Sequence, residues 1–128
     1  MTKQKVLIIE DDDAIATMYT MKLELSKFDV MRAPNGHVGL ELIDSFHPDI
    51  VLLDLMMPVM SGVETLEHLK DNDQLNKDFK LLILSNMGDM DTAEKIKEFG
   101  VHDFIIKADS SPTQVVEKVQ QLLKKPIA

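Results

Sequence analysis

The hydrophobic residues of the chain follow two alternating patterns. Short runs rich in Val, Ile and Leu are typical of buried strands, and the segments between them carry apolar residues at helical spacing. We expect strands at about Lys5–Ile9, Phe28–Arg32, Asp49–Leu55, Lys80–Leu84 and His102–Lys107. We expect helices at about Asp13–Lys27, His37–Phe46, Val63–Lys70, a short segment from Asp91 or Thr92 to Gly100, and a last helix beginning at Pro112.

This alternation predicts an α/β fold. The run "DIVLLDL" is apolar without interruption, as expected of a central parallel strand covered on both faces. Parallel strands require right-handed crossovers, so five strands and five helices predict a doubly wound, five-stranded parallel sheet. In such sheets, ligands bind beyond the carboxyl ends of the strands.

Two helices carry further signals. Before the last helix, Ser111 is placed as the N-cap, Pro112 as the first helical residue and Gln114 as the partner in a capping box. The first helix is apolar nearly all round, which exceeds one core-facing stripe, so part of it is a candidate partner surface.

Polar side chains gather where the predicted strands end. Glu10 and Asp11 follow the first strand, Asp54 ends the third, Ser85 follows the fourth and Lys107 ends the fifth. Carboxylates from adjacent strands would converge there, and their repulsion would recruit a cation. These ligands are all oxygen atoms, with no His or Cys among them. Because they are few and leave room for water, they favour Mg²⁺.

This set of groups indicates a phosphoacceptor. An Asp carboxylate can act as a nucleophile and form an aspartyl phosphate, while Mg²⁺, a lysine and a hydroxyl bind the phosphoryl oxygens. Neither G-x-x-x-x-G-K nor G-x-G-x-x-G occurs, which argues against nucleotide and dinucleotide sites.

Composition and charge narrow the function classes. The 128 residues suit one domain, and we expect a single domain spanning 1–128 with no output domain. With 22 acidic and 14 basic residues, the net charge of −8 argues against direct nucleic acid binding. The absence of cysteine excludes disulfides and thiolate metal sites. No apolar run is long enough for a signal peptide or a membrane span, so we expect a cytoplasmic protein with no membrane contact.

At this point the chain resembles the receiver domain of two-component response regulators. The resemblance rests on "VLIIED" at 6–11, "DLMMPVMSG" at 54–62, "LILSN" at 82–86 and "FIIK" at 104–107, in this order and spacing. It covers essentially the whole chain and implies the flavodoxin-like (βα)5 fold with strand order 2-1-3-4-5.

The resemblance also implies roles for individual residues. Asp54 matches the phosphoacceptor, Asp11 a direct metal ligand, and Glu10 a ligand that acts through water. The backbone carbonyl of Met56 would complete the metal site, and Lys107 matches the lysine of the phosphorylation site. Ser85 and Phe104 match the two residues of the family that change conformation when the domain is phosphorylated. Ser85 would also contact the phosphoryl group.

One position departs from the family pattern. Ala108 follows Lys107 where receivers usually carry a proline, and the family's Lys-Pro bond is typically cis. A cis bond before alanine costs about 2.5–4 kcal/mol. We expect either a trans Lys107-Ala108 bond with a rearranged loop or a retained, strained cis bond, and favour the trans form.

Other residues have simpler interpretations. Asp12 and Asp13 lie outside the family pattern and suit the opening of the first helix, where acidic side chains favour the helix dipole. The four histidines, at 37, 47, 68 and 102, share no spacing and are interpreted as surface residues. Of the nine methionines, those near the active end are interpreted as loop and gap-filling residues or, alternatively, as an adaptable docking rim.

The predicted function is a phosphorylation switch. A histidine kinase or phosphotransfer protein would phosphorylate Asp54, and a separate output protein would bind the altered surface. The protein would not be an enzyme in the turnover sense, and would be a monomer or a phosphorylation-dependent dimer.

Two rival functions are open to test. The first is a degenerate, non-phosphorylated receiver that acts as a protein-binding platform, which only Ala108 supports. The second is a phosphatase with an aspartate nucleophile, but such enzymes need a second acid two residues after the nucleophile, where this chain has Met56.

Overall fold

The computed structural model describes residues 3–55, 61–71, 79–85, 99, 103–106 and 110–124, with Ser85 described only in its backbone. Apart from Phe99, the expected helix ending at Gly100 lies outside these residues. The strands are β1 (Lys5–Ile9), β2 (Asp29–Ala33), β3 (Ile50–Asp54), β4 (Lys80–Ser85) and β5 (Asp103–Ile106). The helices are α1 (Asp13–Leu25), α2 (Gly36–Phe46), α3 (Gly62–Asp71) and α5 (Pro112–Leu123).

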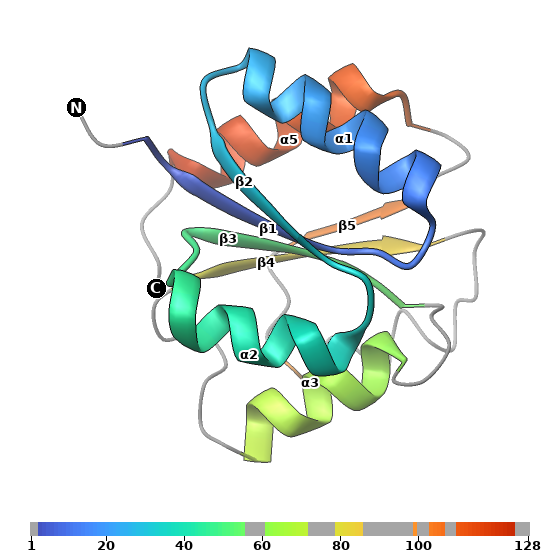
Figure 1. Ribbon diagram of the computed structural model, residues 1–128. Coiled ribbons are helices and arrows are strands. Elements are labelled where there is room, and N and C mark those ends of the chain that lie inside the picture. The colour runs from blue at the N-terminus through green and yellow to red at the C-terminus, as the bar shows by residue number, and fades with distance from the viewer. Residues whose placement is uncertain are drawn as a thin grey trace.

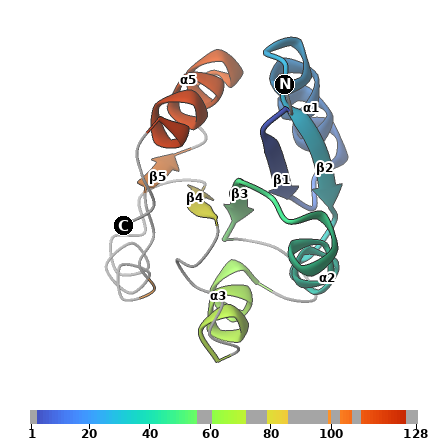
Figure 2. The ribbon, with the colours of Figure 1, turned by 90° about the vertical axis from the view of Figure 1, so that its left-hand side faces the viewer.

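The five strands form one parallel sheet in the order β2-β1-β3-β4-β5, which confirms the predicted topology. Helices α1 and α5 cover one face and α2 and α3 the other (Figures 1 and 2). Because all strands run in the same direction, their carboxyl ends meet at one edge, which is on the right in Figure 1.

Alternation along the strands builds a core on each face of the sheet. In β3, Val51 and Leu53 join the cluster beneath α2 and α3, and Ile50 and Leu52 join the cluster beneath α1 and α5. All four are fully buried, because successive side chains of a strand point to opposite faces. This explains the uninterrupted apolar sequence.

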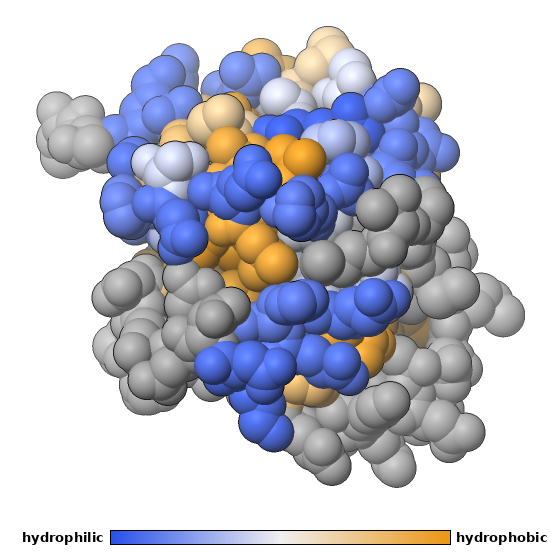
Figure 3. Space-filling model, turned by 60° about the horizontal axis from the view of Figure 1, so that its bottom comes forward, coloured by the Kyte–Doolittle hydropathy of each residue, from blue (hydrophilic) through white to orange (hydrophobic). Residues whose placement is uncertain are grey.

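The face formed by α2 and α3 alternates in polarity. Seen from that side, hydrophobic atoms lie between bands of hydrophilic atoms (Figure 3). This pattern is typical of amphipathic helices whose apolar stripes turn inward while charged residues face the solvent.

Helix α1 ends two residues earlier than predicted. Ser26 is the C-cap, and Lys27 adopts a left-handed backbone with φ of 74°, which stops the helix. The backbone N–H of Phe28 bonds to the carbonyl of Leu23 at 3.1 Å, so β2 begins one residue later than expected, at Asp29.

The predicted start of α5 is confirmed, and α1 carries apolar residues on more than its core-facing side, as expected. In α5, Ser111 and Gln114 form the capping box and Pro112 is the first helical residue. Helix α1 buries Ala16, Tyr19 and Leu23 and leaves apolar residues exposed on its other side, at Met18, Met21 and Leu25. No helix in the described part of the chain is long and apolar enough to cross a membrane.

Candidate functional site

Three carboxylates meet at the carboxyl edge of the sheet. Asp54 is the last residue of β3, and Glu10 directly follows β1, one position beyond the paired residues Ile9 and Leu53. One carboxylate oxygen from each of Glu10, Asp11 and Asp54 lies within 4.8 Å of the other two. Among the residues that the structure describes, this is the one group of three or more His, Asp or Glu side chains close enough to share a metal ion.

The three carboxylates differ in exposure. Glu10 is fully buried and Asp54 is 3% exposed, whereas Asp11 faces the solvent. Buried carboxylates are costly unless hydrogen bonds, opposite charges or a metal compensate them. Two buried acids beside an open third one therefore form a group of oxygen donors of the kind that suits a hard cation, with Asp11 on the solvent side.

The backbone around Glu10 is fixed from β2. The N–H of Glu10 donates to the carbonyl of Ala33 at 3.0 Å. Its own carbonyl accepts from the Arg32 Nε at 2.9 Å, and the same guanidinium bonds to Asp13 through Nη1 at 2.7 Å. Arg32 thus ties the segment that carries Glu10 and Asp11 to the first turn of α1.

Arg32 is absent from the residues predicted from sequence. A signal was present: β2 lies beside β1 in the expected order, and Arg32 stands at the carboxyl end of an otherwise mostly apolar strand. The family motifs do not include this position, so only the geometry of neighbouring strands could have identified it.

The adjacent acids Asp12 and Asp13 belong to the helix, as predicted. The Asp12 carboxylate accepts a hydrogen bond from the N–H of Ile15 at 3.0 Å and caps α1. Asp13 is the first residue of the helix and pairs with Arg32. Neither belongs to the carboxylate group of the site.

The remaining predicted residues are only partly described. Ser85 ends β4 and pairs with Ile106 in β5, so its backbone lies at the same edge of the sheet. Phe104 lies in β5 and packs, partly buried, against the core beneath α2 and α3. The Ser85 side chain, the Met56 carbonyl, Lys107 and the Lys107-Ala108 bond lie outside the described residues.

The histidines take no part in the site as far as the structure describes them. His37, His47 and His68 are exposed, as predicted, and the fourth, at 102, lies outside the described residues. His37 lies 3.6 Å from Glu41 on the next turn of α2, a surface contact.

Comparison with known proteins agrees with this arrangement. Residues 6–120 match the model of the response regulator receiver domain family. The phosphate regulon transcriptional regulatory protein PhoB of Pseudomonas aeruginosa is 30% identical over 125 residues, which cover 98% of this chain and 54% of that protein. The transcriptional regulatory protein SrrA of Staphylococcus aureus is 31% identical over 94% of this chain and 48% of its own length. This chain therefore spans about half the length of these curated relatives.

Solved structures share the fold. A receiver domain from Methanospirillum hungatei superimposes with a TM-score of 0.86 at 24% identity, covering 96% of this chain and 95% of that one. The receiver domain of the Francisella response regulator 1452 gives a TM-score of 0.84 at 27% identity over 95% of this chain and 98% of its own. The topology, the carboxylate group and these matches lead to one conclusion: the chain belongs to the response regulator receiver domain family.

Proposed function

We propose that this protein is a phosphoacceptor switch in which Asp54 receives a phosphoryl group from a histidine kinase or a phosphotransfer protein. The observation that carries the proposal is the convergence of Glu10, Asp11 and Asp54 within 4.8 Å at the carboxyl edge of the sheet, in a chain of the receiver family. Histidine kinases are the phosphodonors with which proteins of this family work.

The donor set fits Mg²⁺. Asp11, Asp54 and the Met56 carbonyl would hold the ion directly, with Glu10 acting through water, and all of these donors are hard oxygens. When bound, Mg²⁺ offsets the negative charge of the incoming phosphoryl group.

The protein's own groups do the rest of the chemistry. A carboxylate oxygen of Asp54 forms a bond to phosphorus as the bond between phosphorus and the donor's imidazole nitrogen breaks, and the imidazole leaves. Lys107 and Ser85 would bind the phosphoryl oxygens. The aspartyl phosphate is later hydrolysed on the same protein, so catalysis is directed only at itself.

Output would pass through a partner protein. Ser85 and Phe104 would rearrange after phosphorylation and change the surface beside β4 and β5. A protein surface, rather than DNA, would bind there, because the net charge of −8 of this chain disfavours contact with a phosphate backbone.

Intact-mass measurement after incubation with phosphoramidate and Mg²⁺ tests the proposal. We expect the mass to rise by one phosphoryl group, and labelling to fall about tenfold when the metal is chelated. Asp54→Asn should abolish the added mass, whereas Asp29→Asn, an acid on the exposed edge strand, should leave it unchanged. Labelling that survives Asp54→Asn would overturn the assignment of Asp54.

A further inference from the structure

The backbone next to Asp54 is held from two directions. The N–H of Leu55, which belongs to the peptide that follows Asp54, bonds to the carbonyl of Leu84 in β4 at 3.1 Å. The carbonyl of Leu55 accepts a bond from the N–H of Gly62, the first residue of α3, at 3.0 Å. The start of α3 therefore fixes one side of the segment that carries the proposed phosphoacceptor.

Thr65 holds the other polar atom of the same peptide unit. Ser61 caps α3, because its hydroxyl accepts the N–H of Glu64 at 3.2 Å, and the peptide that joins it to Gly62 carries the Ser61 carbonyl. That carbonyl accepts two bonds from Thr65, one from the backbone N–H at 3.0 Å and one from the side-chain hydroxyl at 2.9 Å. Because a peptide unit is planar, fixing its carbonyl also fixes the direction in which its N–H points toward Leu55.

The bond from the Thr65 hydroxyl distinguishes α3 from the other helix starts that the structure describes. In α1, α2 and α5, the residue four positions after the cap also donates its N–H to the cap carbonyl. These residues are Ala16, Gly39 and Val115, and none of their side chains can donate a hydrogen bond. Among these four helices, the second bond thus occurs in the one whose first residue lies against the Asp54 backbone.

Helix formation alone does not require this hydroxyl. Helix α5 also begins with a capping box, formed by Ser111 and Gln114, and it places the fully buried Val115 where α3 places Thr65. Thr65 is fully buried as well. A threonine hydroxyl that bonds to a carbonyl one turn earlier adds no stability to a helix and often bends it. The stability of α3 therefore does not account for a threonine at this position.

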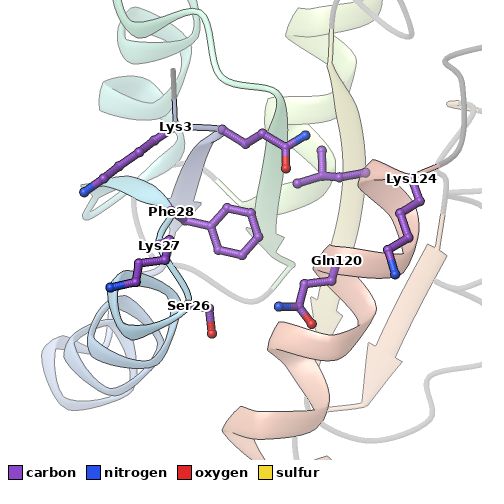
Figure 4. A pocket seen from close by; sticks show the side chains of 8 residues that line it. Lys3, Ser26, Lys27, Phe28, Gln120 and Lys124 are labelled. Carbon is purple, nitrogen blue, oxygen red and sulfur yellow. The ribbon is translucent and has the colours of Figure 1, made fainter. Parts of the chain in front are cut away.

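The hydroxyl does not serve either of two surface hollows that described residues line. One, of about 730 Å³, lies between the carboxyl ends of α1 and α5 at the opposite edge of the sheet (Figure 4). The other, of about 250 Å³, lies between α1 and β2. Thr65 lines neither of them, and its hydroxyl has the Ser61 carbonyl as its partner.

We propose that Thr65 is a positioning residue that holds the Asp54 backbone through the peptide between Ser61 and Gly62. The Thr65 hydroxyl fixes the Ser61 carbonyl. The Gly62 N–H then fixes the carbonyl of Leu55, the residue that follows Asp54. Without the hydroxyl, the Ser61 carbonyl keeps one of its two bonds, so the peptide can tilt while α3 stays folded. This role deepens the proposed function and rests on Asp54 as the phosphoacceptor.

Two substitutions of Thr65 separate positioning from packing. Thr65→Val keeps the shape of the side chain and removes the hydroxyl, whereas Thr65→Ser keeps the hydroxyl and removes a buried methyl group. A displacement of about 1 Å can cost about 100-fold in rate, so for the smaller tilt in Thr65→Val we expect about tenfold weaker Mg²⁺ binding and about tenfold slower labelling by phosphoramidate. Its midpoint of urea unfolding should stay close to that of the parent, because no buried carbonyl loses its last partner. Thr65→Ser should lower this midpoint and keep the Mg²⁺ affinity and labelling rate of the parent.

The amide signal of Gly62 reports its bond to Leu55 without any phosphodonor. It should move upfield in Thr65→Val, as the bond lengthens, and move less in Thr65→Ser. Val115→Thr, the reverse change at the corresponding position of α5, should alter neither this signal nor the labelling. If the parent were never labelled, the proposed function would fail, while the Gly62 signal and the Mg²⁺ affinity would still decide the role of Thr65. An unchanged Gly62 signal in Thr65→Val, or an equal loss of Mg²⁺ affinity in Thr65→Val and Thr65→Ser, would overturn that role.

Discussion

Two adjacent aspartates with the same chemistry serve different purposes. The Asp12 carboxylate caps α1 through the N–H of Ile15, while the Asp11 carboxylate lies with Glu10 and Asp54. Asp12 therefore lowers the free energy of the folded helix, whereas Asp11 adds negative charge to an already acidic cluster. A difference of one position in the chain separates a structural role from a proposed metal-binding role.

Substitution of each aspartate should separate the two roles. We expect Asp12→Ala to lower the free energy of unfolding by about 1 kcal/mol, because a helix N–H loses its partner, with little change in Mg²⁺ affinity. Asp11→Ala should weaken Mg²⁺ binding about tenfold or more without loss of stability in metal-free buffer. Urea unfolding and Mg²⁺ titration measure the two effects, and the reverse pattern would show that the roles were exchanged.

Arg32 acts as a positioning residue for the acidic segment. Its Nε holds the Glu10 carbonyl at 2.9 Å and its Nη1 holds the Asp13 carboxylate at 2.7 Å. Lysine has no planar fork with which to bridge both groups. We expect Arg32→Lys to weaken Mg²⁺ binding about tenfold through loss of the Glu10 contact.

The matched control for Arg32 is Asp13→Asn. It removes the ion pair, whose Asp13 side chain is 90% exposed, but leaves the Arg32 bond to Glu10 in place. Exposed pairs contribute about 0–1 kcal/mol, so the Mg²⁺ affinity of this variant should stay close to that of the parent. If Asp13→Asn weakened Mg²⁺ binding and Arg32→Lys did not, the ion pair rather than the carbonyl contact would position the site.

At the scale of elements, the start of α3 packs against the backbone that carries Asp54. A Cβ atom on Gly62 would lie 2.5 Å from the Leu55 Cα and 2.6 Å from the Asp54 carbonyl oxygen. The N–H of Gly62 also bonds to the Leu55 carbonyl at 3.0 Å. The contact is backbone against backbone, so neither side can rotate away.

Gly62→Ala should therefore disturb both stability and the site. We expect a loss of about 1–3 kcal/mol in the free energy of unfolding and slower phosphorylation, since the Asp54 backbone must move. Gly39→Ala is the comparison, because its Cβ would meet side-chain atoms of Ile9, with Cδ1 at 2.5 Å and Cγ1 at 2.9 Å, rather than the backbone that carries Asp54. Stability and labelling rate should change less in Gly39→Ala, and equal effects would contradict this argument.

Most elements were predictable from local signals. The apolar runs defined the strands to within about one or two residues, and the Ser111 capping box located the start of α5. The end of α1 was not predictable, because neither Ser26 nor Lys27 is a usual stop signal and a left-handed lysine is uncommon. The carboxylate group followed from strand ends and family motifs, whereas Arg32 depended on which strands are neighbours.

At the scale of the whole molecule, β3 holds the two halves of the core together. Leu52 belongs to the cluster beneath α1 and α5, and Leu53 to the cluster beneath α2 and α3. Both side chains are fully buried. Two neighbouring residues of one strand thus each pack into a different core cluster, one on each face of the sheet.

Truncation on either face should be equally damaging. We expect Leu52→Ala and Leu53→Ala each to lower the free energy of unfolding by about 2–5 kcal/mol, the usual cost of a cavity at a buried leucine. Urea unfolding followed by circular dichroism measures both. A much smaller loss for one variant would show that its face can collapse around the cavity and that the two halves of the core differ in rigidity.

The left-handed backbone at Lys27 has a consequence for the thermal stability of the protein. A side chain other than glycine in that conformation costs about 1–2 kcal/mol relative to ordinary helical backbone. Glycine adopts this conformation without that cost, so Lys27→Gly should raise the melting temperature, which thermal unfolding followed by circular dichroism measures.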